Sequence, residues 1–252
     1  MRQGRLPAVV LGLWGLYCLL SAWYALPSGM PQPADLVMVL LVTMLALQVV
    51  IHRALPMEAD YQPILIFASG FLGYVILITL YRAVELADPA LMRFPVYYGY
   101  NVAVLGAGIV LGVLYRERFL QITVVALTLI GLLQIAWLLL SGEDRPDLRA
   151  TGFFNNPNQF GYAGLLLVMI AVTSMWAGAV RNLLAAIAIS VGVVIIAMSL
   201  SKAAILGLLV LSPVAFYLYP AYSVLGLAIL AAIGYMVKDL TVVDIMIRQF
   251  RA

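Results

Sequence analysis

Long apolar runs separated by short polar connections make up almost all of this 252-residue chain. Nine of these runs are long enough to cross roughly 30 Å of hydrocarbon as a helix. They cover residues 7–26, 34–51, 64–81, 96–115, 119–140, 160–180, 183–200, 203–219 and 221–237. The runs lack the two-residue alternation of membrane β-strands, so their backbone groups have to pair within each segment. The pattern predicts an all-α, polytopic membrane protein with about nine transmembrane helices.

The composition supports the same fold class. Apolar residues make up 65% of the chain, charged residues make up 10%, and the mean hydropathy is +1.08, which soluble globular domains do not reach. The first run has no small-x-small cleavage site before Pro27, so we interpret it as a retained helix rather than a signal peptide. The connections are too short to form a soluble domain. Residues 1–252 are therefore interpreted as a single transmembrane domain.

The basic residues bear on the orientation of the chain. With the N-terminus in the cytoplasm, six Lys and Arg residues lie inside and eight lie outside, three of them beyond the last predicted helix. This count gives no positive-inside signal, but the basic N-terminus and the turn at residues 116–118 favour a cytoplasmic N-terminus. In that orientation the longest polar insert, residues 141–159, is external.

Several kinds of site are excluded by the residues at hand. Cys18 is the only cysteine and His52 the only histidine, so neither a disulfide nor a Cys/His metal cluster is expected. We find no Gly-rich phosphate loop and no paired carboxylates within a span, and we expect no metal, no cofactor and no nucleic-acid partner. Polar residues inside the spans are interpreted as interhelical hydrogen-bonding groups that carry no site: Ser69, Thr79, Asn101, Thr123, Thr128 and Gln134.

The end of the polar insert, LRATGFFNNPNQFG at residues 148–161, has the composition of a structured turn before a helix. Gly152 permits a tight or left-handed turn. Asn156 precedes Pro157 and is therefore biased to extended backbone geometry. Asn158 is expected to cap the helix that follows.

Phe153 and Phe154 are expected to dip into the membrane interface, while Arg149 stays in water at the level of the lipid headgroups. A guanidinium held there can bind a lipid-borne phosphate. An ordinary aromatic-belt turn capped by asparagine is the alternative interpretation of the same residues.

A second polar cluster, Ser199, Ser201 and Lys202, lies at the junction of two apolar runs. A cation there costs several kcal/mol unless it snorkels to the interface or has an anionic partner. Taken alone, the cluster fits a short polar turn with a snorkelling lysine. With a cytoplasmic N-terminus, however, Lys202 lies on the same side as Arg149, and two cation-bearing turns on one face favour an anion site.

The two polar clusters resemble a known pair of motifs. RATGFFNNPNQFG at residues 149–161 resembles the Arg-x-x-Gly-x-Phe-x-Asn-Pro-Asn signature of the O-antigen ligase and O-antigen polymerase superfamily. SLSKAA at residues 199–204 resembles its second signature, Ser-x-Ser-Arg followed by small residues. The order of the motifs, the two predicted helices between them and the frame of nine apolar runs are similar to the N-terminal portion of that family.

The resemblance implies an inverting, metal-independent glycosyltransferase of a bacterial inner membrane, with the motif loop on its periplasmic face. The donor would be a glycan linked to undecaprenyl diphosphate, and the acceptor a lipid A core, a growing polysaccharide or a protein. Arg149 and Lys202 would contact the donor diphosphate and stabilise charge on the leaving group. The residues implied to bind substrate or shape the loop are Gly152, Asn156, Pro157, Asn158, Ser199 and Ser201.

The sequence departs from the family in two places. Lys202 stands where the family usually has arginine, and an ammonium group cannot form the bidentate fork to a diphosphate. The family also continues into a long external loop with a catalytic histidine, whereas this sequence ends at Ala252, soon after the ninth run. We therefore expect a truncated or split member that holds the donor-binding half, with a second chain supplying the rest.

Two other functions fit the polytopic pattern. A small-solute transporter of the bicarbonate type needs no acid–base pair, but it predicts discontinuous helices and ionisable groups at mid-membrane, where this sequence has few. A non-catalytic membrane remnant predicts that changing Arg149 and Lys202 has no effect.

Overall fold

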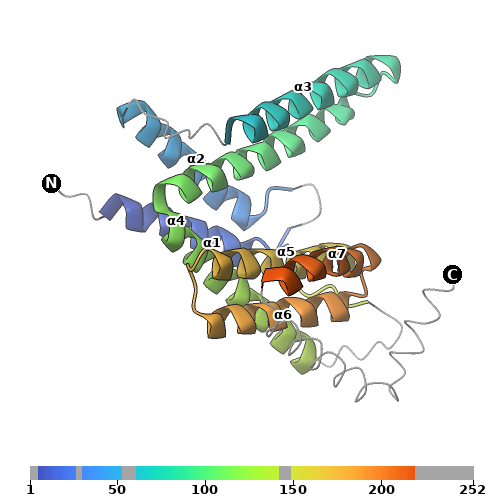
Figure 1. Cartoon of the computed structure of the whole chain (residues 1–252). Coiled ribbons are helices and arrows are strands. Elements are labelled where there is room, and N and C mark those ends of the chain that lie inside the picture. The colour runs from blue at the N-terminus through green and yellow to red at the C-terminus, as the bar shows by residue number, and fades with distance from the viewer. Residues whose placement is uncertain (1–4, 27–29, 53–60, 142–148, 219–252) are drawn as a thin grey trace. The chain divides into compact units, whose positions relative to one another are not determined.

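All regular structure in the described part of the chain is helical (Figure 1). The computed structural model describes residues 5–26, 30–52, 61–141 and 149–218. The helices are α1 (Arg5–Leu20), α2 (Pro33–His52), α3 (Gln62–Glu85), the short 3₁₀ helix η2 (Pro89–Met92), α4 (Arg93–Leu140), α5 (Pro157–Trp176), α6 (Asn182–Ser199) and α7 (Lys202–Leu218). The predicted all-α fold class is confirmed for these residues.

Four helical segments are long and apolar enough to cross a membrane: α3, the segment Pro89–Leu140, α5 and α6. The helices α1, α2 and α7 contain shorter apolar stretches. Four candidate spans of this kind indicate a multi-pass membrane protein. Each of the first eight predicted runs overlaps a described helix, whereas the ninth, at residues 221–237, lies outside the described residues.

The predicted boundary between the fourth and fifth runs lies inside α4. Two runs, 96–115 and 119–140, were expected to form separate helices, and the 48 residues of α4 are two helices joined across a kink. Arg116, with φ 39° and ψ −110°, departs from helical geometry inside it. A straight helix of that length would extend about 72 Å, more than twice the hydrocarbon thickness, so the break at Arg116 is needed if both halves are to cross.

The chain divides into two compact units. One contains residues 1–17 and 34–119, and in it Asp88 begins η2 by accepting a hydrogen bond from the backbone N–H of Ala90 at 3.0 Å. The other contains residues 18–33 and 120–252. Both polar motifs belong to this second unit, so the site is built from its elements alone.

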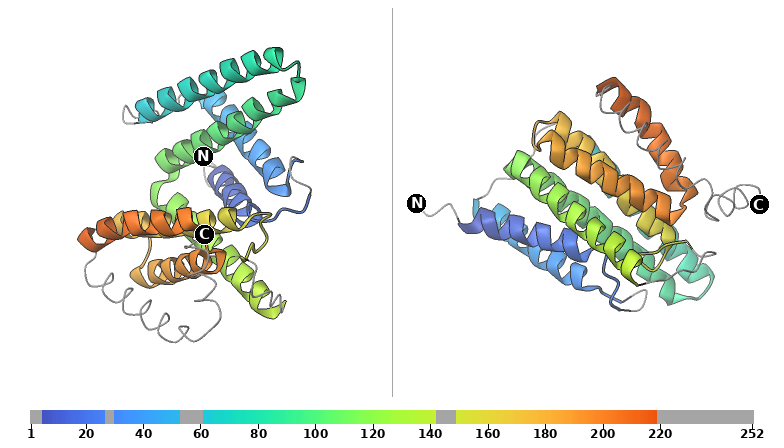
Figure 2. Two further views of the ribbon diagram at one scale, coloured as in Figure 1. Left: turned by 90° about the vertical axis from the view of Figure 1, so that its right-hand side faces the viewer. Right: turned by 90° about the horizontal axis from the view of Figure 1, so that it is seen from below.

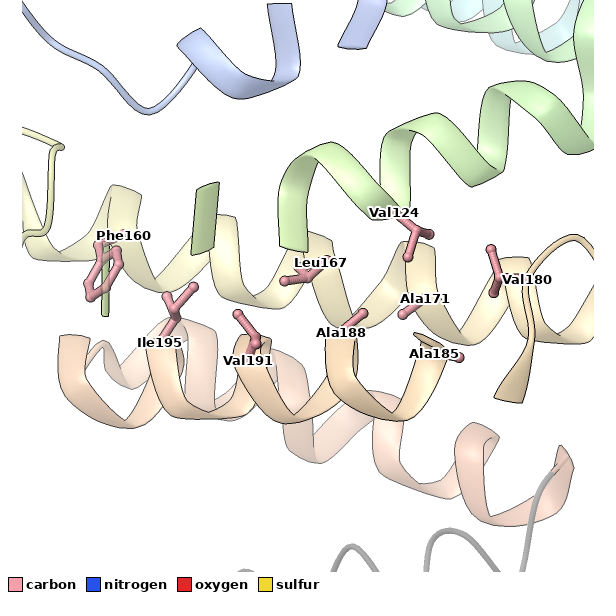
Figure 3. Close-up of a cluster of buried hydrophobic side chains, with 9 residues drawn as sticks. All are labelled: Val124, Phe160, Leu167, Ala171, Val180, Ala185, Ala188, Val191 and Ile195. Carbon is pink, nitrogen blue, oxygen red and sulfur yellow. The ribbon is translucent and has the colours of Figure 1, made fainter. Parts of the chain in front are cut away.

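The second unit is organised around the pair α5 and α6, which lie side by side (Figures 1 and 2). Figure 3 shows apolar side chains of the two helices facing each other, together with Val124 from the second half of α4 and Val180 from the connection between α5 and α6. The buried cluster consists of Val124, Phe160, Leu167, Ala171, Val180, Ala185, Ala188, Val191 and Ile195. Most of these side chains are small or β-branched, which allows the helix axes to approach closely.

Two glycines mark the closest approach of α5 and α6. A Cβ atom at Gly164 would lie 2.6 Å from the backbone oxygen of Gly192, and a Cβ atom at Gly192 would lie 2.7 Å from the backbone oxygen of Gly164. The two backbones are therefore in direct contact. In this packing mode van der Waals contact between backbones holds membrane helices together, because lipid provides no hydrophobic drive between them.

Candidate functional site

The loop before α5 is fixed by local backbone chemistry. Asn156 has φ −144° and ψ 131°, and its side chain accepts a hydrogen bond from the backbone N–H of Asn158 at 2.8 Å. Gly152 has φ +57°. The extended geometry of Asn156 and the left-handed turn at Gly152 are therefore confirmed. The prediction that Asn158 caps the helix is wrong: the helix begins at Pro157, which has no N–H to satisfy, and the residue before the proline is the cap.

Replacing Asn156 with alanine is expected to destabilise the start of α5 by about 0.5–2 kcal/mol, because the backbone N–H of Asn158 loses its acceptor. Asn156→Asp retains a side-chain oxygen and serves as the control. Thermal unfolding of the two variants in one detergent would test this, and equal melting temperatures would show that the cap contributes nothing.

Arg149 joins the two polar motifs. Its Nε donates a hydrogen bond to the backbone oxygen of Ser199 at 3.0 Å, and its Nη2 donates to Oδ1 of Asn158 at 2.7 Å. The neighbouring backbone N–H of Ala150 donates to the oxygen of Met198 at 3.2 Å. Residues that lie 50 positions apart in the sequence therefore meet at one point. A guanidinium has five N–H donors. Among the described residues these two bonds use two of the five, which leaves three donors that can meet a ligand.

The junction between α6 and α7 is a tight turn. Leu200 has φ 50° and ψ 30°, the left-handed geometry with which many helices end, although glycine usually occupies that position. The Ser199 hydroxyl donates to the backbone oxygen of Ile196 at 2.8 Å and accepts from the N–H of Ser201 at 3.2 Å. Ser201 in turn accepts from the N–H of Ala204 at 3.4 Å. Both serines are buried, so in this structure they hold the turn that Arg149 contacts.

A close contact requires glycine at position 161, the end of the loop motif. A Cβ atom there would lie 2.6 Å from Oγ of Ser199 and 2.7 Å from Cβ of Ser201. The first turn of α5 therefore packs directly on the α6–α7 junction. Any larger residue would separate the two motifs, since the atoms it would meet belong to buried side chains.

Lys202 is the first residue of α7, and its side chain is exposed. It follows Ser199, whose carbonyl binds Arg149, by three positions. The structure thus attaches Arg149, Asn158, Ser199 and Ser201 to each other through hydrogen bonds or direct packing. Lys202 is carried by the same junction.

Gln134 was predicted to be an interhelical hydrogen bonder without a role in a site, and the structure gives it a different partner. Its side chain is 1% exposed on α4, and its Oε1 accepts the backbone N–H of Phe153 at 3.2 Å. A Cβ atom at Gly152 would lie 2.5 Å from the same oxygen. Gln134 therefore supports the loop that carries Arg149. A single amide in an apolar run was the only signal in the sequence, and it did not reveal this partner.

Thr128 also departs from the interhelical prediction. Its hydroxyl donates to the backbone oxygen of Val124, one turn earlier in its own helix, at 2.6 Å. Such a bond satisfies a buried hydroxyl without a second helix, which is why the sequence pattern alone does not distinguish the two cases.

Replacing Gln134 with leucine is expected to leave the partly buried N–H of Phe153 without an acceptor, at a cost of about 1 kcal/mol. Gln134→Glu retains an acceptor oxygen and is the matched control. Amide hydrogen exchange at residues 150–154 should be faster in the leucine variant than in the glutamate variant. Unchanged exchange in both would exclude a supporting role for Gln134.

The predicted interface residues Phe153 and Phe154 are partly buried against other aromatic rings. Phe153 contacts Trp23 and Trp137, and Phe154 contacts Tyr24. The loop thus takes part in an aromatic cluster and also carries Arg149 and the asparagines.

Among the described residues, no group of three His, Cys, Asp or Glu side chains is arranged to hold a metal ion. Cys18 is buried in α1, and His52 is the last residue of α2. Comparison of the chain with protein-family models, with curated proteins and with solved structures finds no match.

Proposed function

We propose that the chain binds a glycan linked to undecaprenyl diphosphate and takes part in its transfer, as an O-antigen ligase- or polymerase-like membrane glycosyltransferase. The observation that carries the proposal is the hydrogen bond from Arg149 to the carbonyl of Ser199. It unites the two segments that resemble the family signatures, residues 149–161 and 199–204. If the likeness of either segment to its family signature were due to chance, the two segments would not be expected to lie in contact.

The electrostatics of the site also suit a diphosphate. Arg149 bonds Asn158, the second residue of α5, and Ser199, three residues before α7 begins at Lys202. Helix N-termini attract anions through their unpaired N–H groups and partial positive charge. Arg149 and Lys202 add two formal positive charges.

The chemistry assigned to these residues is charge stabilisation. When the glycosidic bond to the donor phosphate breaks, negative charge develops on the leaving diphosphate. Arg149, held by Ser199 and Asn158, is fixed before that charge appears, so little reorganisation is needed. Lys202 contributes as a point charge rather than as a bidentate donor.

The proposal includes nine transmembrane spans, a bacterial inner-membrane location and a motif loop on the periplasmic face. The apolar helices and the polar composition of the loop support this placement. The acceptor would be a glycan, a lipid or a protein that reaches the same face.

The purified chain in lipid nanodiscs should bind undecaprenyl diphosphate and not undecaprenol, because the diphosphate makes the contacts. Inorganic diphosphate should compete, and the affinity should fall with added salt. Equal binding of the two lipids would contradict the proposal. A solute flux through liposomes that contain the chain would favour the transporter function instead.

A further inference from the structure

The aromatic cluster at the motif loop contains rings from three separate segments of one compact unit. The rings of Trp23 and Phe153 are stacked, with centroids 6.1 Å apart and planes at 24°. The ring of Trp137, from the last turn of α4, is tilted against that of Phe153, with centroids 6.1 Å apart and planes at 53°. These separations are typical of favourable aromatic pairs.

The central ring is held in place by its backbone. The N–H of Phe153 donates to Gln134, and its carbonyl accepts the N–H of Tyr24 at 3.3 Å. Phe153 is thereby tied to α4 on one side and to the segment after α1 on the other. Because hydrogen bonds hold both the N–H and the carbonyl of Phe153, this residue loses little conformational entropy when a ligand stacks on the cluster.

The outer rings are available to a ligand. Trp23 and Trp137 are each 54% exposed, so each presents a large apolar area at the surface of the unit. Neither indole N–H has an acceptor among the residues that the structure describes. An indole therefore offers both an apolar face and a hydrogen-bond donor here.

The same loop also carries amide groups that suit hydroxyls. Asn155 and Gln159 are exposed in the same loop and the first turn of α5, within a few residues of Phe153. Amides both donate and accept hydrogen bonds, as hydroxyl groups do. A surface made only to face acyl chains needs no such amides.

We infer that Trp23, Phe153 and Trp137 form a sugar-binding platform, on which the apolar C–H face of a pyranose stacks while the neighbouring amides bind its hydroxyls. This inference rests on the proposed function for the identity of the sugar, which is the first sugar of the diphosphate-linked donor. Phe153 follows Arg149 by four residues, which span at most about 14 Å, so the first sugar of a glycan whose diphosphate is bound at Arg149 can reach the rings.

The chain offers a matched control for the exposed tryptophans. Trp176 is 68% exposed and is the last residue of α5. The loop adjoins the first residue of α5, and a 20-residue helix is about 30 Å long. Trp176→Ala therefore removes an exposed indole far from the platform.

The test compares undecaprenyl diphosphate with the same lipid carrying one N-acetylhexosamine, using the full chain in nanodiscs. The unaltered chain should bind the glycosylated lipid roughly three- to tenfold more tightly. Trp23→Ala and Trp137→Ala should each reduce that ratio toward one, whereas Trp23→Phe and Trp176→Ala should preserve it. Circular dichroism and a size-exclusion profile identify any variant that fails to fold.

The outcomes separate this inference from the proposed function. Arg149→Ala should weaken the binding of both lipids and leave their ratio unchanged. If neither tryptophan variant alters the ratio, or if both weaken the two lipids equally, the surface contacts lipid and the sugar platform is overturned. If undecaprenyl diphosphate does not bind at all, the binding of a soluble N-acetylhexosamine disaccharide is measured by saturation-transfer NMR. A signal that the Trp23→Ala change abolishes supports the platform, and the absence of a signal overturns it.

Discussion

Replacing Arg149 with alanine is expected to weaken the binding of undecaprenyl diphosphate by about 10- to 100-fold. Charge-assisted hydrogen bonds contribute about 1.5–3 kcal/mol each, and about 1.4 kcal/mol corresponds to tenfold in affinity. The substitution also removes the two bonds that hold the loop to Ser199 and Asn158. The measurement is the Kd for the lipid in nanodiscs at fixed salt concentration, since the affinity of charged groups depends on ionic strength.

Two variants separate charge from geometry in this experiment. Arg149→Lys retains the positive charge but cannot reproduce the guanidinium fork, so it should bind with intermediate affinity. Arg181→Ala removes an exposed cation from the opposite end of α6 and should leave the Kd unchanged. If Arg181→Ala weakens binding as much as Arg149→Ala, the effect reflects net charge and the proposed site is wrong.

The second large effect is expected at the contact between α5 and α6. In Gly164→Ala the new Cβ atom would lie 2.6 Å from the Gly192 backbone oxygen and 2.8 Å from Cγ2 of Ile195. Neither neighbour can retreat without moving a helix, because one is backbone and the other is a buried side chain. We expect a loss of about 1–3 kcal/mol in the free energy of unfolding, measured by denaturation in mixed micelles.

Gly106 in α4 provides the control for this substitution. A Cβ atom there would meet no heavy atom within 4 Å. Since alanine has a higher helix propensity than glycine, by about 1 kcal/mol, Gly106→Ala should be neutral or stabilising. Equal destabilisation by the two changes would show that the close approach of the helices contributes nothing to stability.

The hydrophobic pattern predicts the helices well because lipid leaves few alternatives. A long apolar run has to be helical to satisfy its own backbone, so the positions of α2, α3, α5 and α6 follow from the sequence. The ends of the helices follow less closely from the hydrophobic pattern. The first run was expected to reach residue 26, but α1 ends at Leu20. The residues after it form an irregular segment, in which the N–H of Tyr24 bonds the carbonyl of Phe153 instead of a carbonyl of α1.

The candidate site was predictable only in part. Residue types in the loop gave the turn at Gly152 and the extended geometry before Pro157, since both are local backbone effects. The pairing of Arg149 with the carbonyl of Ser199 depends on tertiary packing, and any residue type supplies a carbonyl. The partner of Gln134 was hidden for the same reason, because it is a backbone N–H.

The contact between Gly164 and Gly192 also bears on how the chain assembles. The two glycines are linked through the short connection Ala177–Arg181, so bringing them together closes only a small loop and costs little entropy. Such local contacts form quickly. We expect α5 and α6 to associate as a hairpin soon after they leave the ribosome, before α7 is complete. The docking of Arg149 onto the α6–α7 junction would then be a late step of folding, completed on a helical pair that already exists.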